Sequence, residues 1–293
     1  MNTITKKAYG KINLALDTIG KRQDGYHLVR MIMQTVNLYD IVTITKKETP
    51  GITLTTNRLD LPTDENNLIY KAAKILIEEY HIAEGVSIHL EKRIPVAAGM
   101  AGGSTDCAAT LEGMNTLFSL GLSEDELMKR GVTLGADVPY CIMGGTALSE
   151  GIGEILTPLS DMVACKVLLI KPDIDISTKW VYTTLKWDQL TSHPDIDGMI
   201  SSLETQSLSD IASKLENVLE TVTIPANPVI ADIKENMKSL GALNALMSGS
   251  GPTVFGLFED ETVASKAYEQ CKQLYPDYQV ELTDFVTREM KQA

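Results

Sequence analysis

Hydrophobic residues recur with two different periods along the first half of the chain, and these periods predict a mixture of strands and helices. Short apolar or alternating stretches predict strands at 8–16, 29–38, 40–46, 51–55, 85–90 and 146–149. Helical spacing or helix-forming composition predicts helices at 67–80, 107–118 and 124–134. Ser123 precedes the last of these helices and is a typical N-cap residue.

The second half of the chain has a different rhythm, with more helix. Strands are expected at 167–170, 243–247, 253–258 and 279–286. Helices are expected at 178–185, 196–203, 208–219, 229–239 and 262–274. Strands and helices mix without a strict strand–helix–strand alternation, which favours an α+β fold over a doubly wound parallel sheet. We place a domain boundary near 157–161 and predict two domains, 1–160 and 161–293.

The composition is that of a globular protein, because 44% of the 293 residues are hydrophobic and can form a full core. No apolar run approaches the roughly 20 residues that a membrane-spanning helix needs. The N-terminus lacks the apolar stretch of a signal peptide, so we expect a cytoplasmic protein without a membrane partner. A net charge of −13 argues against a nucleic-acid partner, since non-specific binding needs a basic surface.

Cysteine and histidine spacing indicates neither a zinc site nor a disulfide framework. The four cysteines form no CxxC pair, and the four histidines show no metal-ligand spacing. We therefore expect free and mostly buried thiols at Cys107, Cys141, Cys165 and Cys271. Metal ligands cannot be assigned from these residues.

The stretch 95–109, PVAAGMAGGSTDCAA, is the strongest functional signal in the chain. Gly99, Gly102 and Gly103 lie between a predicted strand and a predicted helix. Glycine lets backbone N–H groups turn toward a ligand, and a helix N-terminus adds unpaired donors and a partial positive charge. The loop therefore suits phosphate. It matches neither a Walker nor a Rossmann loop, and a turn of small residues without a ligand is the alternative.

Three other features carry chemistry only in combination with this loop. Lys11 lies in an apolar strand, where its ammonium needs a partner or water; a side chain extended to solvent is the alternative. Asp137 lies among small and apolar residues, as a general base or as a turn or helix-cap residue. Residues 249–252, Gly-Ser-Gly-Pro, form either a second glycine platform or a bare tight turn.

The order of these features resembles the GHMP kinase superfamily, whose members carry an N-terminal lysine motif, a central phosphate loop and a C-terminal glycine-rich motif. Lys11 and the stretches 95–109 and 247–256 match the three motifs in order. The elements of the resemblance span nearly the whole chain and are Ala8-x-Gly-Lys-Ile-Asn-Leu14, Asp24-Gly-Tyr-His27, Lys92-Arg-Ile-Pro95, Gly102-Gly-Ser-x-Asp106, Gly135-Ala-Asp-Val-Pro139 and Asn217-x-Leu-Glu220. The Asp-Gly-Tyr-His element is the most discriminating. This element is similar to one found in those family members that phosphorylate a cytidine-diphosphate alcohol in the non-mevalonate isoprenoid pathway.

The resemblance implies a two-domain GHMP kinase fold, with a ribosomal-S5-like N-terminal domain and a ferredoxin-like C-terminal domain. It implies ATP-dependent transfer to a tertiary hydroxyl, with Lys11 and Asp137 as catalytic residues: Asp137 accepts the hydroxyl proton, and Lys11 orients that hydroxyl or offsets charge. The implied ATP-binding residues are Pro95, Ala97, Gly99, Met100, Ala101, Gly102, Gly103, Ser104, Thr105 and Asp106. The implied substrate-binding residues are Asn13, Tyr26, His27, Gly249 and Ser250.

Mg²⁺ is expected with ATP; no protein ligand is assigned to it, and Ser104 and Thr105 are candidates. The partner is a small molecule, and the chain is expected to be a monomer or a homodimer. Two other functions stay open. One is a different GHMP kinase, such as a mevalonate or homoserine kinase, against which the Asp-Gly-Tyr-His element argues. The other is a nucleotide-binding relative without activity, which would bind ATP without turnover.

The phosphate loop departs from the family's usual Gly-Leu-Gly-Gly-Gly-Ser-Ser-Asp-Ala-Ala at Met100, Ala101, Thr105 and Cys107. The change at Ala101 matters most, because it replaces a glycine and a Cβ atom disfavours positive φ. Either the backbone at this position keeps φ below zero, or the loop is reshaped.

Overall fold

A computed structural model describes residues 1–292, and their contacts form two compact units, each discontinuous in sequence. Unit 1 contains Met1–Gly10, Leu38–Ile94 and Ala101–Met143. Unit 2 contains Lys11–Asn37, Pro95–Met100 and the described residues from Gly144 onward. Two long strands, β1 (Thr3–Lys21) and β2 (His27–Lys47), contribute residues to both units. These contact groups do not test the domain boundary near residue 160, which stays a prediction.

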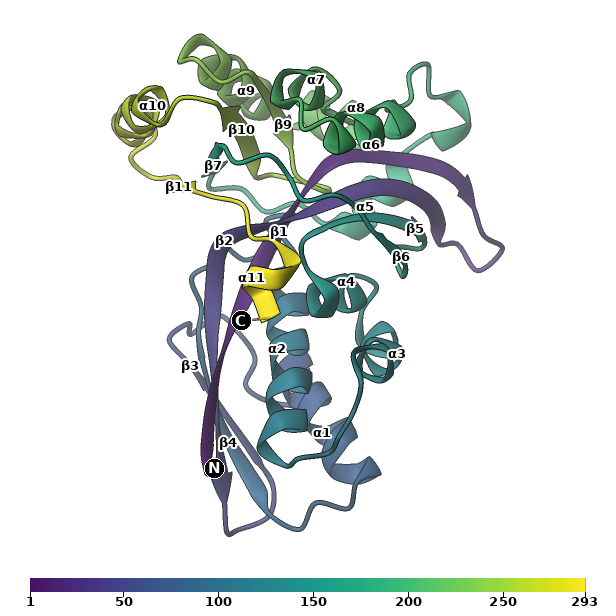
Figure 1. Cartoon of the computed structure of the whole chain (residues 1–293), viewed down its shortest axis with the longest axis vertical. Coiled ribbons are helices and arrows are strands. Elements are labelled where there is room, and N and C mark those ends of the chain that lie inside the picture. Colours follow the sequence, from purple (N-terminus) through teal and green to yellow (C-terminus); the bar gives the residue numbers. More distant parts are fainter. Residues whose placement is uncertain (293) are drawn as a thin grey trace. The chain divides into compact units, whose positions relative to one another are not determined.

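Unit 1 places helices against strands. Besides its parts of β1 and β2, it contains β3 (Ile52–Thr56), α1 (Leu68–Glu79), β4 (Gly85–Glu91), α2 (Gly102–Leu117), α3 (Glu124–Leu134) and α4 (Val138–Met143). β4 pairs antiparallel with residues 41–47 of β2 and parallel with β3. α1 and α2 lie side by side (Figure 1). α1 buries Ile69, Ala72, Ala73 and Leu76, the spacing of a helix with one apolar face.

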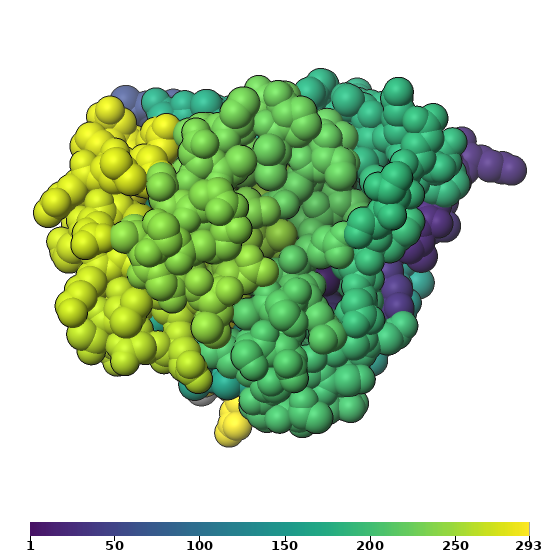
Figure 2. Space-filling model, turned by 90° about the horizontal axis from the view of Figure 1, so that it is seen from above, coloured from purple at the N-terminus to yellow at the C-terminus, as the bar shows by residue number. Residues whose placement is uncertain are grey.

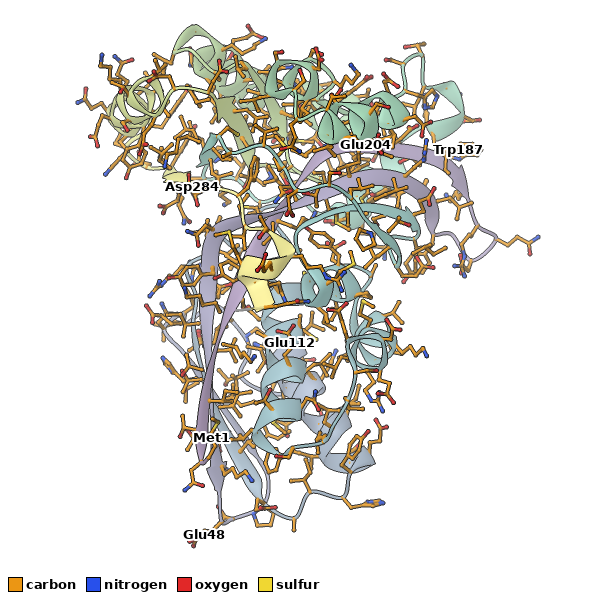
Figure 3. All side chains as sticks on the ribbon, in the orientation of Figure 1. Met1, Glu48, Glu112, Trp187, Glu204 and Asp284 are labelled. Carbon is orange, nitrogen blue, oxygen red and sulfur yellow. The ribbon has the colours of Figure 1, made fainter. Side chains whose placement is uncertain are left out.

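α2 is the central helix of unit 1, and ten of its sixteen residues are buried. Its packing requires a small residue at Gly113, because a Cβ atom there would lie 2.7 Å from Cδ1 of Ile44 on β2. The side chain of the neighbouring Glu112 is labelled in Figure 3. A helix buried on most sides lacks a clear apolar stripe, which explains why its start is hard to place from the sequence.

α3 begins at a capping box, which confirms the predicted N-cap. The Ser123 hydroxyl accepts a hydrogen bond from the Glu126 backbone N–H at 3.3 Å, and Glu126 Oε2 accepts one from the Ser123 N–H at 2.9 Å. Two otherwise unpaired N–H groups are thereby satisfied. The acidic residues of the first turn also interact favourably with the positive end of the helix dipole.

Unit 2 contains the remaining elements. They are β5 (Thr146–Gly151), β6 (Ile155–Pro158), β7 (Lys166–Lys171), α5 (Thr178–Thr184), the 3₁₀ turn η1 (Trp187–Gln189), α6 (Ile196–Glu204), α7 (Leu208–Ser213), β8 (Glu216–Asn217), α8 (Glu220–Ala226), α9 (Val229–Ser239), β9 (Asn244–Met247), β10 (Val254–Phe258), α10 (Glu261–Leu274), β11 (Gln279–Thr283) and α11 (Arg288–Gln292). β5 pairs antiparallel with residues 29–34 of β2 and with β6, and the short β8 pairs parallel with β1.

The C-terminal part of unit 2 contains an antiparallel four-stranded sheet in the order β11-β7-β10-β9. Along the chain, helices separate β7 from β9, β10 follows β9 directly, and α10 separates β10 from β11. This is the ferredoxin-like arrangement, as predicted. The helices α7 to α10 occupy the face of unit 2 seen in green and yellow in Figure 2.

Most predicted elements are present, and the differences have local causes. The stretches 29–38 and 40–46 form the single strand β2, which runs without a break through Tyr39 and the buried, ion-paired Asp40. The helix expected over 208–219 ends at Ser213, since the chain then forms β8 beside β1. α2 begins at Gly102 rather than near Cys107. The elements α4, β6, η1, β8, α8 and α11 were not predicted.

Two expectations from composition can also be compared with the structure. No disulfide joins the four cysteines, all of which lie in the described part of the chain, and three of them are buried. Among residues 1–292, no helix combines the length and the apolar composition needed to cross a bilayer.

Candidate active site

The first part of the phosphate loop, Pro95–Met100, is held by contacts within unit 2. The Met100 carbonyl accepts a hydrogen bond from the Lys11 backbone N–H at 3.1 Å. Gly99 has φ +72°, and a Cβ atom there would overlap the carbonyl oxygen of Ser248. The Ser248 hydroxyl in turn donates to the Gly99 carbonyl at 3.0 Å. The loop therefore contacts both the lysine strand and the second glycine-rich turn, 248–251.

Ala101 continues this loop in unit 1 and has left-handed backbone angles, φ +56° and ψ 29°. Of the two alternatives for this position, the one with φ below zero is therefore excluded. Ala101 is also the N-cap of α2, and alanine has no side-chain acceptor for the first N–H groups of the helix. A helix start without a side-chain cap leaves backbone donors for an anion.

A buried ionic cluster of Lys92, Asp40 and Asp106 lies at the first turns of α2. The Lys92 ammonium donates to Asp106 Oδ2 at 2.8 Å and also to Asp40, and all three residues are buried. Asp40 Oδ1 accepts hydrogen bonds from the backbone N–H groups of Arg93 at 2.5 Å and Ile94 at 2.8 Å. The cluster thus joins β2, the segment before the phosphate loop and the first turns of α2.

The Asp106 carboxyl has an unusual environment. Burial raises its pKa well above the ordinary value of 3.8, and the neighbouring Asp40 adds to this, while Lys92 acts in the opposite direction. Its Oδ1 atom is buried and has no hydrogen-bond partner among residues 1–292. A Cβ atom at Gly102 would lie 2.8 Å from Lys92 Nζ, so this glycine permits the close approach. Asp106 as an ATP contact stays a prediction.

Lys92 and Asp40 were not among the residues predicted for the site. A signal for both existed in the sequence. Lys92 opens the Lys-Arg-Ile-Pro element, and Asp40 is a carboxylate inside an otherwise apolar stretch. Neither signal indicates an ion pair, because the pairing depends on the return of β4 beside β2.

Lys11 and Asn13 form a buried polar pair on β1. Lys11 Nζ donates to Asn13 Oδ1 at 2.8 Å, and Lys11 is only 5% exposed. The alternative of a lysine extended to solvent is therefore wrong. Asn13 Nδ2 contacts Met31 Sδ at 3.2 Å. A Cβ atom at Gly249 would lie 3.0 Å from the Gly99 carbonyl oxygen and 3.5 Å from Asn13 Oδ1. Unit 2 thus brings Lys11, Asn13, Gly99 and Gly249 together.

The second glycine-rich turn is more than a bare turn, since it packs against the first loop. Gly249 and Gly251 have positive φ, +56° and +87°. The hydroxyls of Ser250 and Thr178 are hydrogen-bonded at 2.8 Å, and the Ser250 carbonyl accepts from the Thr223 hydroxyl at 3.3 Å. Substrate binding by Gly249 and Ser250 stays a prediction.

The two aromatic residues of the Asp-Gly-Tyr-His element lie in different environments. Tyr26 is 58% exposed, whereas His27 is buried and its ring centroid lies 5.3 Å from that of Tyr182 on α5. His27 Nε2 is buried and has no hydrogen-bond partner in the described chain. Burial, with a smaller effect of Lys21, lowers the pKa of His27 below 6.5, so the imidazole is neutral at pH 7. Tyr182 was not predicted for the site.

Asp137 directly precedes α4, where a cap residue would lie. The Val138 N–H bonds to the Gly135 carbonyl at 3.1 Å, and the Asp137 carbonyl accepts from the Cys141 N–H at 3.0 Å. A Cβ atom at Gly135 would lie 3.7 Å from Ser104 Oγ, so this turn lies beside the first turn of α2. Both interpretations of Asp137, general base and cap, stay open.

The residues present are compatible with Mg²⁺ bound chiefly through a nucleotide. Residues 1–292 contain no group of three or more His, Cys, Asp or Glu side chains arranged to hold a metal ion. Mg²⁺ in kinase sites is usually held by one or two protein ligands together with substrate phosphates, so it does not need such a group. Ser104 and Thr105 lie in the first turn of α2 and stay candidates.

Comparison with known proteins agrees with this arrangement of motifs. The family models for the GHMP kinases N terminal domain and the GHMP kinases C terminal region match residues 67–145 and 199–277. The 4-diphosphocytidyl-2-C-methyl-D-erythritol kinase of Lachnoclostridium phytofermentans is 57% identical over 93% of this chain and 94% of its own length. The Clostridium perfringens protein of the same name is 50% identical, with 94% and 96% covered.

A solved structure leads to the same family. The crystal structure of a 4-(cytidine 5'-diphospho)-2C-methyl-D-erythritol kinase superimposes with a TM-score of 0.83 at 28% identity, covering 96% of this chain and 99% of that one. The chain therefore belongs to the GHMP kinases. It is a kinase with the two-domain α+β fold of that family, as predicted, and the family uses ATP as the phosphoryl donor.

Proposed function

We propose that this kinase transfers the γ-phosphoryl group of ATP to the tertiary hydroxyl of 4-diphosphocytidyl-2-C-methyl-D-erythritol, a step of the non-mevalonate route to isoprenoid precursors. The names of the relatives at 57% and 50% identity support this substrate. In the structure, the observation that carries the proposal is the buried, unpartnered Nε2 atom of His27 beside the ring of Tyr182.

A cytosine base would satisfy both features of this position. An aromatic ring offers a stacking surface to any base. A neutral imidazole nitrogen can donate to, or accept from, the edge of the base, according to its tautomer. A buried polar atom without a partner is costly, and a ligand that supplies the missing hydrogen bond removes that cost. Neither mevalonate nor homoserine contains a base that could do so.

The phosphoryl transfer itself depends mainly on positioning and on neutralising charge. We propose that the phosphate loop and the start of α2 bind the triphosphate through backbone N–H groups, which α2 leaves uncapped at Ala101. Lys11 orients the acceptor hydroxyl or offsets charge, and Asp137 accepts its proton. Mg²⁺, when bound with ATP, supplies charge neutralisation at the phosphates.

A coupled assay of ADP release tests the proposal. The same enzyme preparation is given the cytidyl substrate, mevalonate or homoserine, each with ATP and Mg²⁺. We expect turnover of the cytidyl substrate and little or none of the two smaller alcohols. A comparable kcat/KM for mevalonate or homoserine would contradict the proposal. ATP binding without turnover of any of the three would show a nucleotide-binding relative without this activity.

A further inference from the structure

The Asn-x-Leu-Glu element, 217–220, has no part in the function described so far, although Asn217 is nearly completely buried. Asn217 lies on β8, paired in register with Leu16 of β1. The following N–H group, that of Val218, donates to the Leu16 carbonyl at 3.0 Å. The backbone at Asn217 is therefore fixed against the strand that carries Lys11 and Asn13.

The side chain of Asn217 uses both ends of its amide. Nδ2 donates to the carbonyl oxygens of Met247 and Gly249, each at 2.8 Å, and Oδ1 accepts from the Leu219 N–H at 3.0 Å. Only a carboxamide of this length offers two donors and an acceptor in such an arrangement. The two carbonyls flank Ser248, so the amide holds the glycine-rich turn on both sides of that residue.

Ser248 is the residue of this turn that contacts the phosphate loop. Its hydroxyl donates to the Gly99 carbonyl at 3.0 Å, and its carbonyl lies where a Cβ atom at Gly99 would be. Glu220 supports the same strand end, because its Oε1 accepts from the Met247 N–H at 2.9 Å and its Oε2 contacts Lys234 at 2.6 Å. An unbroken series of contacts thus runs from Asn217 through Ser248 to Gly99.

We propose that Asn217 is a positioning residue for nucleotide binding: it holds the turn 248–251 against Gly99 and thereby sets the conformation of residues 95–100. It touches neither ATP nor the acceptor. The proposal rests on ATP being the phosphoryl donor, but not on the identity of the acceptor.

The variant Asn217→Asp isolates this role. The carboxylate keeps the shape of the side chain and an acceptor for Leu219, but it cannot donate to the two carbonyls when ionised. We expect calorimetry to show at least a tenfold weaker Kd for ATP. We expect the KM for ATP to rise by a similar factor.

Asn244→Ala is a matched control at the start of β9, the strand whose last residue is Met247. Asn244 Nδ2 donates to the Ala212 carbonyl at 2.8 Å, and its Oδ1 accepts from the Ala245 N–H at 2.9 Å, so it loses bonds of the same kind. We expect lower thermal stability with an unchanged Kd for ATP. If Asn217→Asp does not fold, Ser248→Ala removes only the hydrogen bond to Gly99. It should raise the Kd for ATP at least threefold in a protein with a normal unfolding transition.

The double variant shows whether the two residues act through one another. In the double variant Asn217→Asp/Ser248→Ala, the fold-increase in the Kd for ATP should be smaller than the product of the two single fold-increases. Both substitutions break the same series of contacts, so their effects are not independent. Wild-type ATP affinity in folded Asn217→Asp or Ser248→Ala would overturn the proposal, as would an equal loss in Asn244→Ala. The proposed substrate is tested separately, because calorimetry with ATP needs no acceptor.

Discussion

Lys92 Nζ lies 2.8 Å from Asp106 Oδ2, inside unit 1 and at the first turns of α2. The same ammonium contacts Asp40, so one positive charge faces two buried carboxyl groups. A single cation compensates a second buried negative charge poorly. The raised pKa of Asp106 follows from this burial and from the charge of Asp40.

The first prediction concerns stability against pH. Because the pKa of Asp106 is higher in the folded than in the unfolded state, the folded protein binds more protons above pH 3.8. The contribution of the protonated Asp106 carboxyl to the free energy of unfolding is complete below that pH, and it is lost as pH rises toward the folded-state pKa. Asp106→Asn cannot titrate. We expect the free energy of unfolding of the wild type, minus that of Asp106→Asn, to fall between pH 4.5 and 8 in urea titrations.

Asp197→Asn is the control for this series. The pKa of Asp197 is lowered, chiefly by its hydrogen bond from Arg30, so its titration lies below pH 3.8. The difference between this variant and the wild type should stay constant across the same pH range. A constant difference for Asp106→Asn as well would show that its carboxyl does not retain a proton in the folded protein.

The second prediction concerns the two residues at the start of α2. Ala101 has φ +56°, and a left-handed backbone costs a residue with a Cβ atom roughly 1–2 kcal/mol. Ala101→Gly should therefore raise the free energy of unfolding by about 1 kcal/mol. It should leave activity equal or higher. Gly102→Ala should lower the free energy of unfolding, because its Cβ atom would lie 2.8 Å from Lys92 Nζ and 3.2 Å from Ile94. Denaturant unfolding and ATP titrations of both variants would check this, and destabilisation by Ala101→Gly would contradict it.

Ala101 also shows where sequence reasoning stops. The sequence identifies the substitution of a glycine, but the sign of φ depends on how the chain enters α2. Local signals were sufficient elsewhere, as in α3, where Ser123 and Glu126 form a capping box within four residues. The ferredoxin-like sheet was predicted only through the family resemblance, since strand order depends on contacts between distant segments.

The residues of the candidate site also fall into two groups, those that local motifs predict and those whose role depends on a residue far away in sequence. Lys11, Gly99 and Gly249 were predicted from motifs, and the structure brings them together in unit 2. Asp40, Tyr182 and the role of Asn217 were not predicted. Each acts through a residue far away in sequence: Asp40 pairs with Lys92, Tyr182 with His27, and Asn217 with Gly249. No spacing within one segment encodes such pairs.

The third prediction concerns base recognition. His27→Ala removes a neutral imidazole whose Nε2 has no partner within residues 1–292. We expect a KM for the cytidyl substrate raised about tenfold or more, with kcat changed little, because a lost base contact is mainly uniform binding. Tyr182→Ala should also raise the KM for the cytidyl substrate. His89→Ala, whose ring bonds to Thr55 in unit 1, is the control and should change neither constant. An unchanged KM in His27→Ala would remove His27 from the site.

The fourth prediction concerns the pH dependence of the same contact. Burial lowers the pKa of His27 below 6.5, so the neutral ring is stabilised above the unfolded-state pKa and this stabilisation is lost as pH falls through the folded-state value. Where Nε2 accepts a hydrogen bond from the base, protonation removes that acceptor, and we expect the KM for the cytidyl substrate to rise on acidification only below pH 6.5 in the wild type. In His27→Ala, this component of the pH profile should be absent. An identical profile in both proteins would show that another group titrates.

The last prediction separates the two interpretations of Asp137, which directly precedes α4. If Asp137 is the general base, Asp137→Asn keeps the shape and removes the proton acceptor, which typically costs about 10²- to 10⁴-fold in rate. The loss should fall on kcat, with ATP affinity kept or slightly improved. If Asp137 is only a cap, Asp137→Ala should cost about 1 kcal/mol of stability, and the folded fraction should turn over normally. Thermal unfolding and kcat measured on the same preparations distinguish these outcomes. A stable Asp137→Asn protein with kcat within a few-fold of the wild type would exclude the base, and the phosphate loop and Lys11 would then supply most of the rate enhancement.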